Sequence, residues 1–446
     1  MNIKYLYLSI YLLVIALITW KSSRGESESD YINRSKQLSG WETTWTTFAS
    51  LLTGYNFVLG VTFAYLYGFW YLMAFAGAGL AFVALYFVFK KQLSVLQRGY
   101  NLFSIGDYFG IKYAVSTKII INIILCVALF LFLTLQIFVN TRLFSMLLGM
   151  DKFTTYLLTT GVVCVYLWIG GFKTSVRTDI FQGFLMLPII LTVLVFPVHF
   201  TWKRIPTALD SSQIGFAIGL ALLQFLSLLA QPESFQRIFA SRDSLALKKG
   251  LTSAFILVAL VAGSMAYLGI NFRFAGINMD AANLFIDGVL IELPHWLGSL
   301  LVVSLIAAFM GTIDSSAFAF GVLLTRARNT LSHSVVNQTR YFMLLGILAS
   351  ALASLYLISF LSSFFALISL ISINGTALLI SLMFRKTDAA EINAFLIVGT
   401  LIYISGLIFK FVTDNPLTSL IQSVGGLMAF LLLRFYRKAI PVLLRQ

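Results

Sequence analysis

The sequence has few charged residues and almost none of the side chains that carry disulfide or transition-metal chemistry. Only 11% of its 446 residues are Asp, Glu, Lys or Arg, against about 25% in soluble globular proteins. Its two cysteines and three histidines lie far apart in sequence, so no clustered metal ligands or paired cysteines are visible. No P-loop, GxSxG or HExxH pattern occurs either. We therefore expect neither an ordinary soluble enzyme nor a transition-metal site.

Apolar residues dominate what remains. They make up 59% of the chain, and the mean hydropathy is +0.91. About 20 consecutive apolar residues cross the hydrocarbon layer of a membrane, and the sequence contains thirteen apolar runs of suitable length. The pattern predicts an all-α polytopic membrane protein with about thirteen spans. The predicted spans are 3–20, 43–66, 68–90, 117–147, 154–171, 178–199, 213–236, 250–272, 295–325, 340–358, 360–384, 392–410 and 416–434.

The basic residues predict how these spans are oriented. The net charge is +14, and placing the N-terminus outside puts 24 of the 31 Lys and Arg residues on the cytoplasmic side. This bias follows the positive-inside rule. The sequence thus predicts an outside N-terminus and a cytoplasmic C-terminus, in a bacterial inner membrane. The basic charge is an insertion signal that also suits contact with anionic lipid, and no nucleic-acid partner is expected.

One polar stretch interrupts the apolar run 295–325. It covers Ala307–Ala317 and reads AAFMGTIDSSA. A carboxylate such as Asp314 costs roughly 2.5–3.5 kcal/mol inside a span, so it needs a partner or a task. Helical spacing places a set of small and hydroxyl-bearing residues on one face beside it: Ala308, Gly311, Thr312 and Ser315. Such a face could pack closely against another helix. With Asp314 added, oxygen ligands for a small cation are the favoured interpretation.

Two spans carry signals of a broken helix. The second span holds Ser50, Thr53, Gly54, Tyr55 and Asn56 at its middle, and the seventh ends with Gln231, Pro232 and Glu233. Glycine lowers the cost of a break, and proline removes a backbone donor. The two spans lie five spans apart and run in opposite directions. Paired interruptions of this kind are the best sequence pointer to the binding site of a transporter.

A third feature is the segment IGGFKTSVRTDIFQ at residues 169–182. It predicts a Gly-Gly turn, a basic segment and then Asp179 at the start of the sixth span. Two structural interpretations stay open beside a functional one. Asp179 could face the positive end of the helix dipole, or it could pair with Arg177.

At these residues the chain resembles the sodium/solute symporter family, whose fold is of the LeuT type with two inverted five-helix repeats. The motifs that carry the resemblance are SDYINRSKQLSGW, YNLFSIGDYFGIKYA, GGFKTSVRTDIFQ, QPESFQRIFASRD and AAFMGTIDSSA. The resemblance implies one transmembrane domain over 1–446. Within it, 1–20 is an extra helix, 41–200 and 211–386 are the repeats, and 391–436 holds two peripheral helices.

The resemblance also implies the positions of two cation sites. The main sodium site takes backbone carbonyls from Ala49, Leu52 and Ala308 and a hydroxyl from Thr312. Its second hydroxyl falls on Gly311, which has none. A second site, found in some relatives, maps to Asp179, Asp314 and Ser315. Asp314 is a departure, because family members usually have a hydroxyl residue there. Two carboxylates around one cation can share a proton, so a proton is an alternative coupling ion.

Solute contacts carry over less directly. Asn56 and Gln231 match positions that contact solute in sugar-transporting relatives, and Thr53, Tyr55 and Glu233 lie beside them. The expected function is symport of sodium with a small organic solute, without a cofactor or an enzymatic activity. The alternatives are proton-coupled symport and a solute sensor that does not transport. A sensor is less expected, because only 434–446 follows the last span as an output segment. The solute and the oligomeric state are not predicted.

Overall fold

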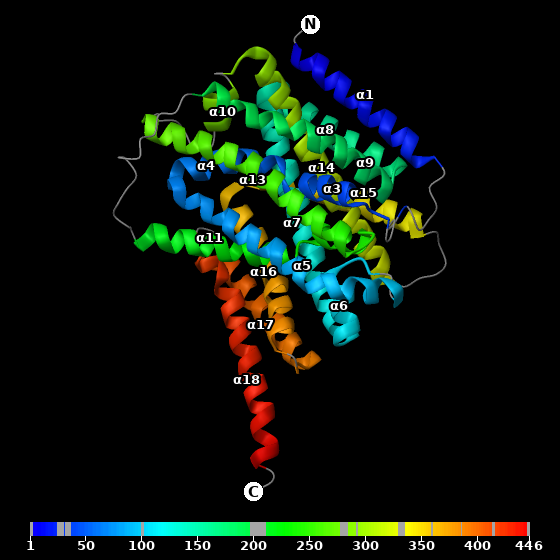
Figure 1. The fold of residues 1–446 in the computed structure, drawn as a ribbon, viewed down its shortest axis with the longest axis vertical. Coiled ribbons are helices and arrows are strands. Elements are labelled where there is room, and N and C mark those ends of the chain that lie inside the picture. The colour runs from blue at the N-terminus through cyan, green and yellow to red at the C-terminus, as the bar shows by residue number, and fades with distance from the viewer. Residues whose placement is uncertain are drawn as a thin grey trace.

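The structure is a computed structural model, and it is helical throughout the part of the chain that it describes (Figure 1). No β-strand occurs among these residues; a single parallel bridge joins Leu38 to Ser241. The described residues are 3–24, 31, 37–99, 102–196, 211–276, 284–290, 293–328, 335–357, 360–384, 386–412 and 415–443.

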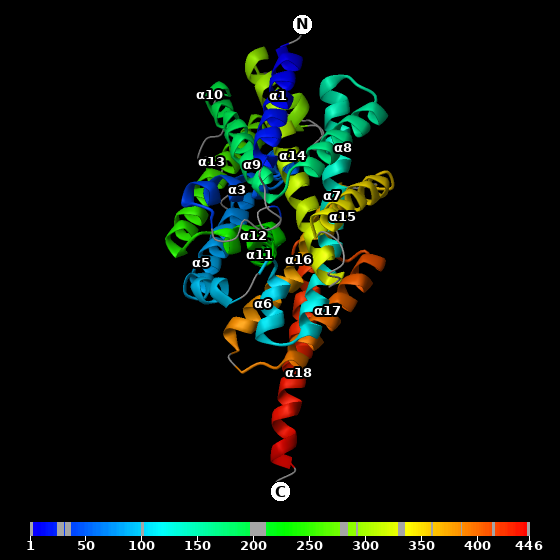
Figure 2. The ribbon, with the colours of Figure 1, turned by 90° about the vertical axis from the view of Figure 1, so that its right-hand side faces the viewer.

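The helices of the first half of the chain are α1 (Ile3–Ser23), α3 (Gly40–Leu51), α4 (Gly54–Tyr67), η1 (Gly68–Leu72), α5 (Met73–Gly99), α6 (Ile105–Lys112), α7 (Val115–Leu148), α8 (Lys152–Ile169), α9 (Phe172–Met186), η2 (Leu187–Leu191) and α10 (Thr192–Val195). Those of the second half are α11 (Ser211–Leu229), α12 (Pro232–Ala240), α13 (Ser244–Ala275), η4 (Phe285–Leu290), α14 (His295–Arg328), α15 (Val335–Ser354), α16 (Phe360–Met383), α17 (Ala389–Ile408), η5 (Thr418–Leu420) and α18 (Ile421–Leu443). The end of α18 extends away from the other helices (Figures 1 and 2).

The predicted count of thirteen spans is not confirmed. Among the described residues, eleven helices are long and apolar enough to cross a membrane, or up to twelve if a bent pair is one span. The difference arises at the predicted spans 43–66 and 68–90. There, α3 has only 12 residues, too few to cross alone, and residues 56–90 form one continuous candidate of 35 residues.

Both predicted interruptions are confirmed. In the second span, α3 ends at Leu51 and α4 begins at Gly54. In the seventh, α11 ends at Leu229, α12 begins at Pro232, and the two helices are bent by 47°. The packing around them is paired: α3 and α4 lie against α13, and α11 lies against α5. Two inverted repeats produce this packing. The broken helix of each repeat packs on the second helix of the other repeat, which is α13 or α5.

Small residues make these two contacts close. A Cβ on Gly77 of α5 would overlap the carbonyl oxygen of Ala221 on α11, and a Cβ on Gly269 of α13 would overlap that of Val61 on α4. We therefore expect Gly77→Ala and Gly269→Ala each to destabilise the protein by about 1–3 kcal/mol, because the backbones must separate. Thermal unfolding of the purified protein measures this.

Gly263 provides the matched control on α13, because no atom of the described residues lies within 4 Å of a Cβ built there. Gly263→Ala is expected to leave stability unchanged or slightly raised, since alanine is the better helix former. Equal losses for Gly263→Ala and Gly269→Ala would contradict the close-contact explanation.

Several of the motifs meet at one end of the bundle. Leu38 precedes α3 and accepts a hydrogen bond from the amide of Arg242, which follows α12, at 2.9 Å. Asp107 of α6 pairs with Lys118 of α7 at 2.9 Å and with Arg326 of α14 at 3.1 Å. Burial alone would raise the pKa of Asp107, but these two cations and the Phe103 amide lower it below its ordinary value. The carboxylate therefore stays ionised at neutral pH and ties α6 to α7 and α14.

Candidate functional site

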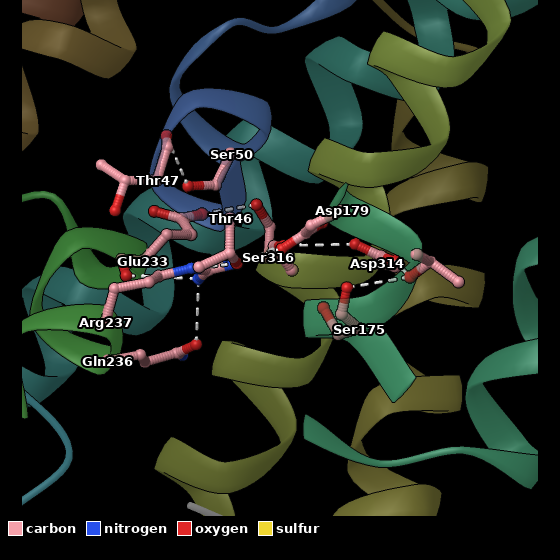
Figure 3. A network of polar contacts seen from close by, with 12 residues as sticks. Thr46, Thr47, Ser50, Ser175, Asp179, Glu233, Gln236, Arg237, Asp314 and Ser316 are labelled. Atoms are coloured by element: carbon pink, nitrogen blue, oxygen red, sulfur yellow. Dashed lines mark hydrogen bonds and ion pairs between the residues drawn. The ribbon is translucent and has the colours of Figure 1, made fainter. Parts of the chain in front are cut away.

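A buried arginine occupies the centre of the region where the broken helices meet α9 and α14. Arg237 of α12 is only 1% exposed. Its Nη2 donates to Asp179 Oδ2 at 3.0 Å and to Ser315 Oγ at 2.8 Å, and its Nε donates to Thr46 Oγ1 at 3.2 Å. Figure 3 shows the Arg237 side chain reaching from α12 toward Asp179. The guanidinium thus donates hydrogen bonds to one carboxylate oxygen and to the hydroxyl of the predicted second cation site.

Asp179 does not stand where the sequence placed it. Helix α9 begins at Phe172, six residues before the predicted start of the span, because the basic segment is itself helical. Asp179 therefore lies two turns inside α9 and cannot act as an N-terminal carboxylate. It does not pair with Arg177 either, whose Nη1 donates to Ser22 Oγ at 3.1 Å. Both structural alternatives for Asp179 are wrong, and its partner is Arg237.

The second carboxylate is held by hydroxyl groups. Asp314 is fully buried; its Oδ1 accepts from Ser315 at 3.2 Å and its Oδ2 from Thr178 at 3.5 Å. Since Ser315 Oγ also accepts from Arg237, the two aspartates are connected through Arg237 and Ser315. The structure therefore brings together Asp179, Asp314 and Ser315, the three residues of the predicted second site. Figure 3 shows the two aspartates side by side.

A third carboxylate adjoins this network. Glu233 of α12 is 3% exposed, and its Oε1 accepts from Ser316 Oγ at 2.5 Å. Its backbone carbonyl accepts from Arg237 Nη1 at 3.2 Å. With all groups ionised, three carboxylates face one guanidinium. Excess negative charge without water is costly unless cations or protons balance it, so the arrangement suits a cation taken up from solution.

The residues of the predicted main sodium site lie at the break between α3 and α4. Ala49 is buried near the end of α3, and Leu52 caps it. The break packs on α14, where a Cβ on Gly54 would overlap the ring of Phe309. The Thr312 hydroxyl donates to the carbonyl of Ala308 at 2.9 Å. Its oxygen lone pairs remain available to a cation.

A cavity of about 80 Å³ lies beside the same break. Helices α3, α4, α5, α11, α13 and α16 line it, mostly with aromatic and aliphatic side chains such as Phe63, Phe75 and Phe364. Its two amide side chains are Asn56 and Gln224. Asn56 Nδ2 also donates to the carbonyl of Leu51 at 3.0 Å, which satisfies part of the broken helix. A mostly apolar pocket with a few polar groups is the usual form of a solute site.

Three other predicted solute residues, Thr53, Gln231 and Glu233, are not among the residues that line this cavity. Thr53 caps α4 by accepting from the Asn56 amide, and Glu233 belongs to the network of Arg237. Gln231 is the N-cap of α12. The side chain of Tyr55 falls outside the described part of the structure.

Sequence reasoning missed two residues. Arg237 is one of the 24 basic residues that the predicted orientation places on the cytoplasmic side. It stands four residues after Glu233 in a short, strongly amphipathic helix, and that spacing is the available signal. Gln224 lies two turns before the break in an apolar run. Nothing in the local sequence separates Gln224 from an amide that packs between helices.

The comparisons with known proteins agree with this architecture. A model of the sodium:solute symporter family matches residues 31–201. A sodium/pantothenate symporter of Haemophilus influenzae is 25% identical over 316 residues, 66% of this chain and 65% of that protein. A sodium/pantothenate symporter of Escherichia coli is 23% identical over 468 aligned residues, 97% of this chain and 96% of that protein. The chain thus spans less than two thirds of the first relative and nearly all of the second.

A solved structure has the same fold. It is a substrate-bound, outward-open state of a Na⁺-coupled sialic acid symporter. It superposes with a TM-score of 0.77 at 18% sequence identity, over 96% of each chain. The matched relatives are transporters and not enzymes. The five motifs, the paired broken helices and these matches together make the chain similar to the sodium:solute symporter family, whose model covers residues 31–201.

Proposed function

We propose that this protein is a secondary active symporter that couples the entry of sodium to the uptake of a small organic solute. The observation that carries the proposal is the excess of buried carboxylate over buried base beside the two helix breaks. Asp179, Asp314 and Glu233 face the single guanidinium of Arg237. A cation that enters this region lowers the free-energy cost of burying the excess negative charge. Each charge moved inward at 100 mV also contributes roughly 2.3 kcal/mol.

The main sodium site would be formed by the carbonyls of Ala49, Leu52 and Ala308 with the hydroxyl of Thr312. Sodium bound there would join the end of α3 to α14. Because the solute cavity lies at the same break, cation and solute would both stabilise one arrangement of α3 and α4. Such shared stabilisation is a coupling free energy, and it acts in both directions.

The cavity favours a solute with an apolar part and groups that bond to amides. Its volume is about 80 Å³. Among the residues that the structure describes, no acidic or basic side chain lines it. An anionic group would instead meet the N-terminus of α4, where free backbone amides attract negative charge. A small organic acid, the class to which pantothenate belongs, fits these features.

Proton coupling is the second candidate. Asp314 is bonded to hydroxyl groups alone in the hydrogen bonds that the structure describes, and a proton could balance its charge as a cation does. The orientation with an outside N-terminus remains a proposal that rests on the distribution of basic residues. Removing Arg237 from the inside set leaves 23 of 31 Lys and Arg there, so the bias persists.

Solute uptake into proteoliposomes tests the function. We expect a sodium gradient, and not a potassium gradient, to drive uptake of a solute found by screening organic acids. Thr312→Ala should raise the sodium concentration for half-maximal uptake at least about tenfold, because a ligand hydroxyl is lost. Thr325→Ala is the matched control on α14, since Thr325 likewise donates to the carbonyl four residues earlier. Uptake driven only by a proton gradient would show that the coupling ion is the proton and not sodium.

A further inference from the structure

Two buried oxygen atoms near the centre of the molecule have no hydrogen-bond partner. They are Oδ1 of Asp179 and Oε1 of Gln182, and both side chains are fully buried on α9. The residues are three apart and share one face of the helix. An unpaired buried acceptor is unfavourable, so two on the same face indicate that something absent from the protein chain itself satisfies them.

Both oxygens face the same residue of α14. A Cβ built on Gly311 would lie 2.6 Å from Gln182 Oε1 and 3.7 Å from Asp179 Oδ1. The amide oxygen of Gln182 therefore occupies the space that a side chain at position 311 would fill. A seryl hydroxyl at this position could not coexist with the observed Gln182 side chain. Gly311 is thus the residue that admits the amide oxygen.

The extra helix α1 sets the direction of this amide. Gln182 Nε2 donates to the Tyr11 hydroxyl at 3.0 Å, and that hydroxyl donates to Met310 Sδ at 3.4 Å. Tyr11 is only 1% exposed. Because the hydroxyl proton is directed at sulfur, its oxygen accepts from the amide nitrogen, and this leaves Oε1 turned toward Gly311.

We propose that Gln182 Oε1 and Asp179 Oδ1 are side-chain ligands of the coupling cation, and that Gln182 supplies the oxygen that Gly311 lacks. The inference deepens the proposed function and rests on it. A carboxylate oxygen and an amide oxygen are ligands suited to a hard cation. Thr312 of the predicted main site follows Gly311 directly, and Asp179 belongs to the predicted second site, so the pair would lie where the two predicted sites adjoin. Tyr11 is a positioning residue, since it acts through the amide of Gln182.

A purely structural role for Gln182 predicts something different. If the amide were reversed, Nε2 would take the place of Oε1 beside Gly311, Oε1 would face the Tyr11 hydroxyl, and Gln182 would offer a cation no oxygen. Replacing Gln182 would then lower stability equally with and without sodium. A hydroxyl introduced at position 311 would not compensate for the loss. The two roles therefore differ in how sodium affinity responds to paired substitutions.

The experiment measures the thermal stability of the purified full-length protein against sodium chloride, with choline chloride holding ionic strength constant. A bound ion stabilises the folded state by RT ln(1 + c/Kd), where c is the sodium concentration, so the concentration needed for a given stabilisation rises in step with Kd. We expect Gln182→Met to raise the sodium concentration that gives a set rise in melting temperature by at least about tenfold. The double variant Gln182→Ala/Gly311→Ser should return to within about threefold of the wild type, because the hydroxyl replaces the amide oxygen.

The matched control is Gln182→Ala/Gly311→Ala, which adds the same Cβ without the hydroxyl and should stay as weak as Gln182→Met. Tyr11→Phe should weaken sodium affinity by a smaller factor. An unchanged sodium requirement in Gln182→Met, or equal sodium requirements in the two double variants, would overturn the inference while leaving sodium symport intact. A wild type whose stability and uptake both ignore sodium would overturn the proposed function as well.

Discussion

Replacing Arg237 by methionine should reduce sodium-driven solute uptake by about 100-fold or more and lower the free energy of unfolding by about 3–5 kcal/mol. The guanidinium is the buried partner of Asp179 at 3.0 Å, and it also bonds to Ser315 and Thr46. Without it, three carboxylates would remain buried with no base among them. Initial rates of uptake and thermal unfolding of the purified protein measure the two effects.

Arg242 is the matched control, five residues further along the chain. Its side chain is 66% exposed, and its ion pair with Asp243 is at the surface. Arg242→Met should therefore change stability by less than about 1 kcal/mol. A double variant, Arg237→Met/Asp179→Leu, removes both buried charges and should recover much of the stability but none of the uptake. Recovery of uptake as well would show that the ion pair is structural only.

Replacing the two aspartates should have unequal effects. Asp179→Asn leaves Arg237 without its carboxylate partner and removes charge from the proposed ligand Oδ1, so we expect uptake to fall about 100-fold or more. Asp314→Ser removes the same charge, but Asp314 makes hydrogen bonds only to hydroxyls, those of Ser315 and Thr178, among the bonds that the structure describes. A serine there can keep such bonds, and uptake should persist within about tenfold of the wild type.

Parallel uptake assays of the two variants, normalised to folded protein, measure the difference. Equal losses of uptake in Asp179→Asn and Asp314→Ser would mean that the carboxylates act as one unit, and that the pairing with Arg237 does not distinguish them. A loss confined to Asp314→Ser would reverse the roles assigned to the two residues.

Local sequence determined much of this protein. The low charge and the long apolar runs determine that it is a membrane protein, because runs of about 20 apolar residues match the thickness of the hydrocarbon layer. Gly54 and Pro232 determine the two interruptions, since each acts on the backbone at its own position. The cost of a carboxylate in a span also singled out Asp179 and Asp314 before any contact was known.

Tertiary structure decided which groups these residues meet. Arg237 resembles an interfacial charge in the sequence, yet the bend after α11 directs it into the core, where Asp179 lies 58 residues away along the chain. Gln182 and Gln224 are single amides in apolar runs, and only the packing of α1, α14 and α5 distinguishes them. Composition and local spacing identify the polar groups that are costly to bury. The partner that offsets this cost comes from another helix. That partner is a property of the packed bundle and is not encoded at any one position.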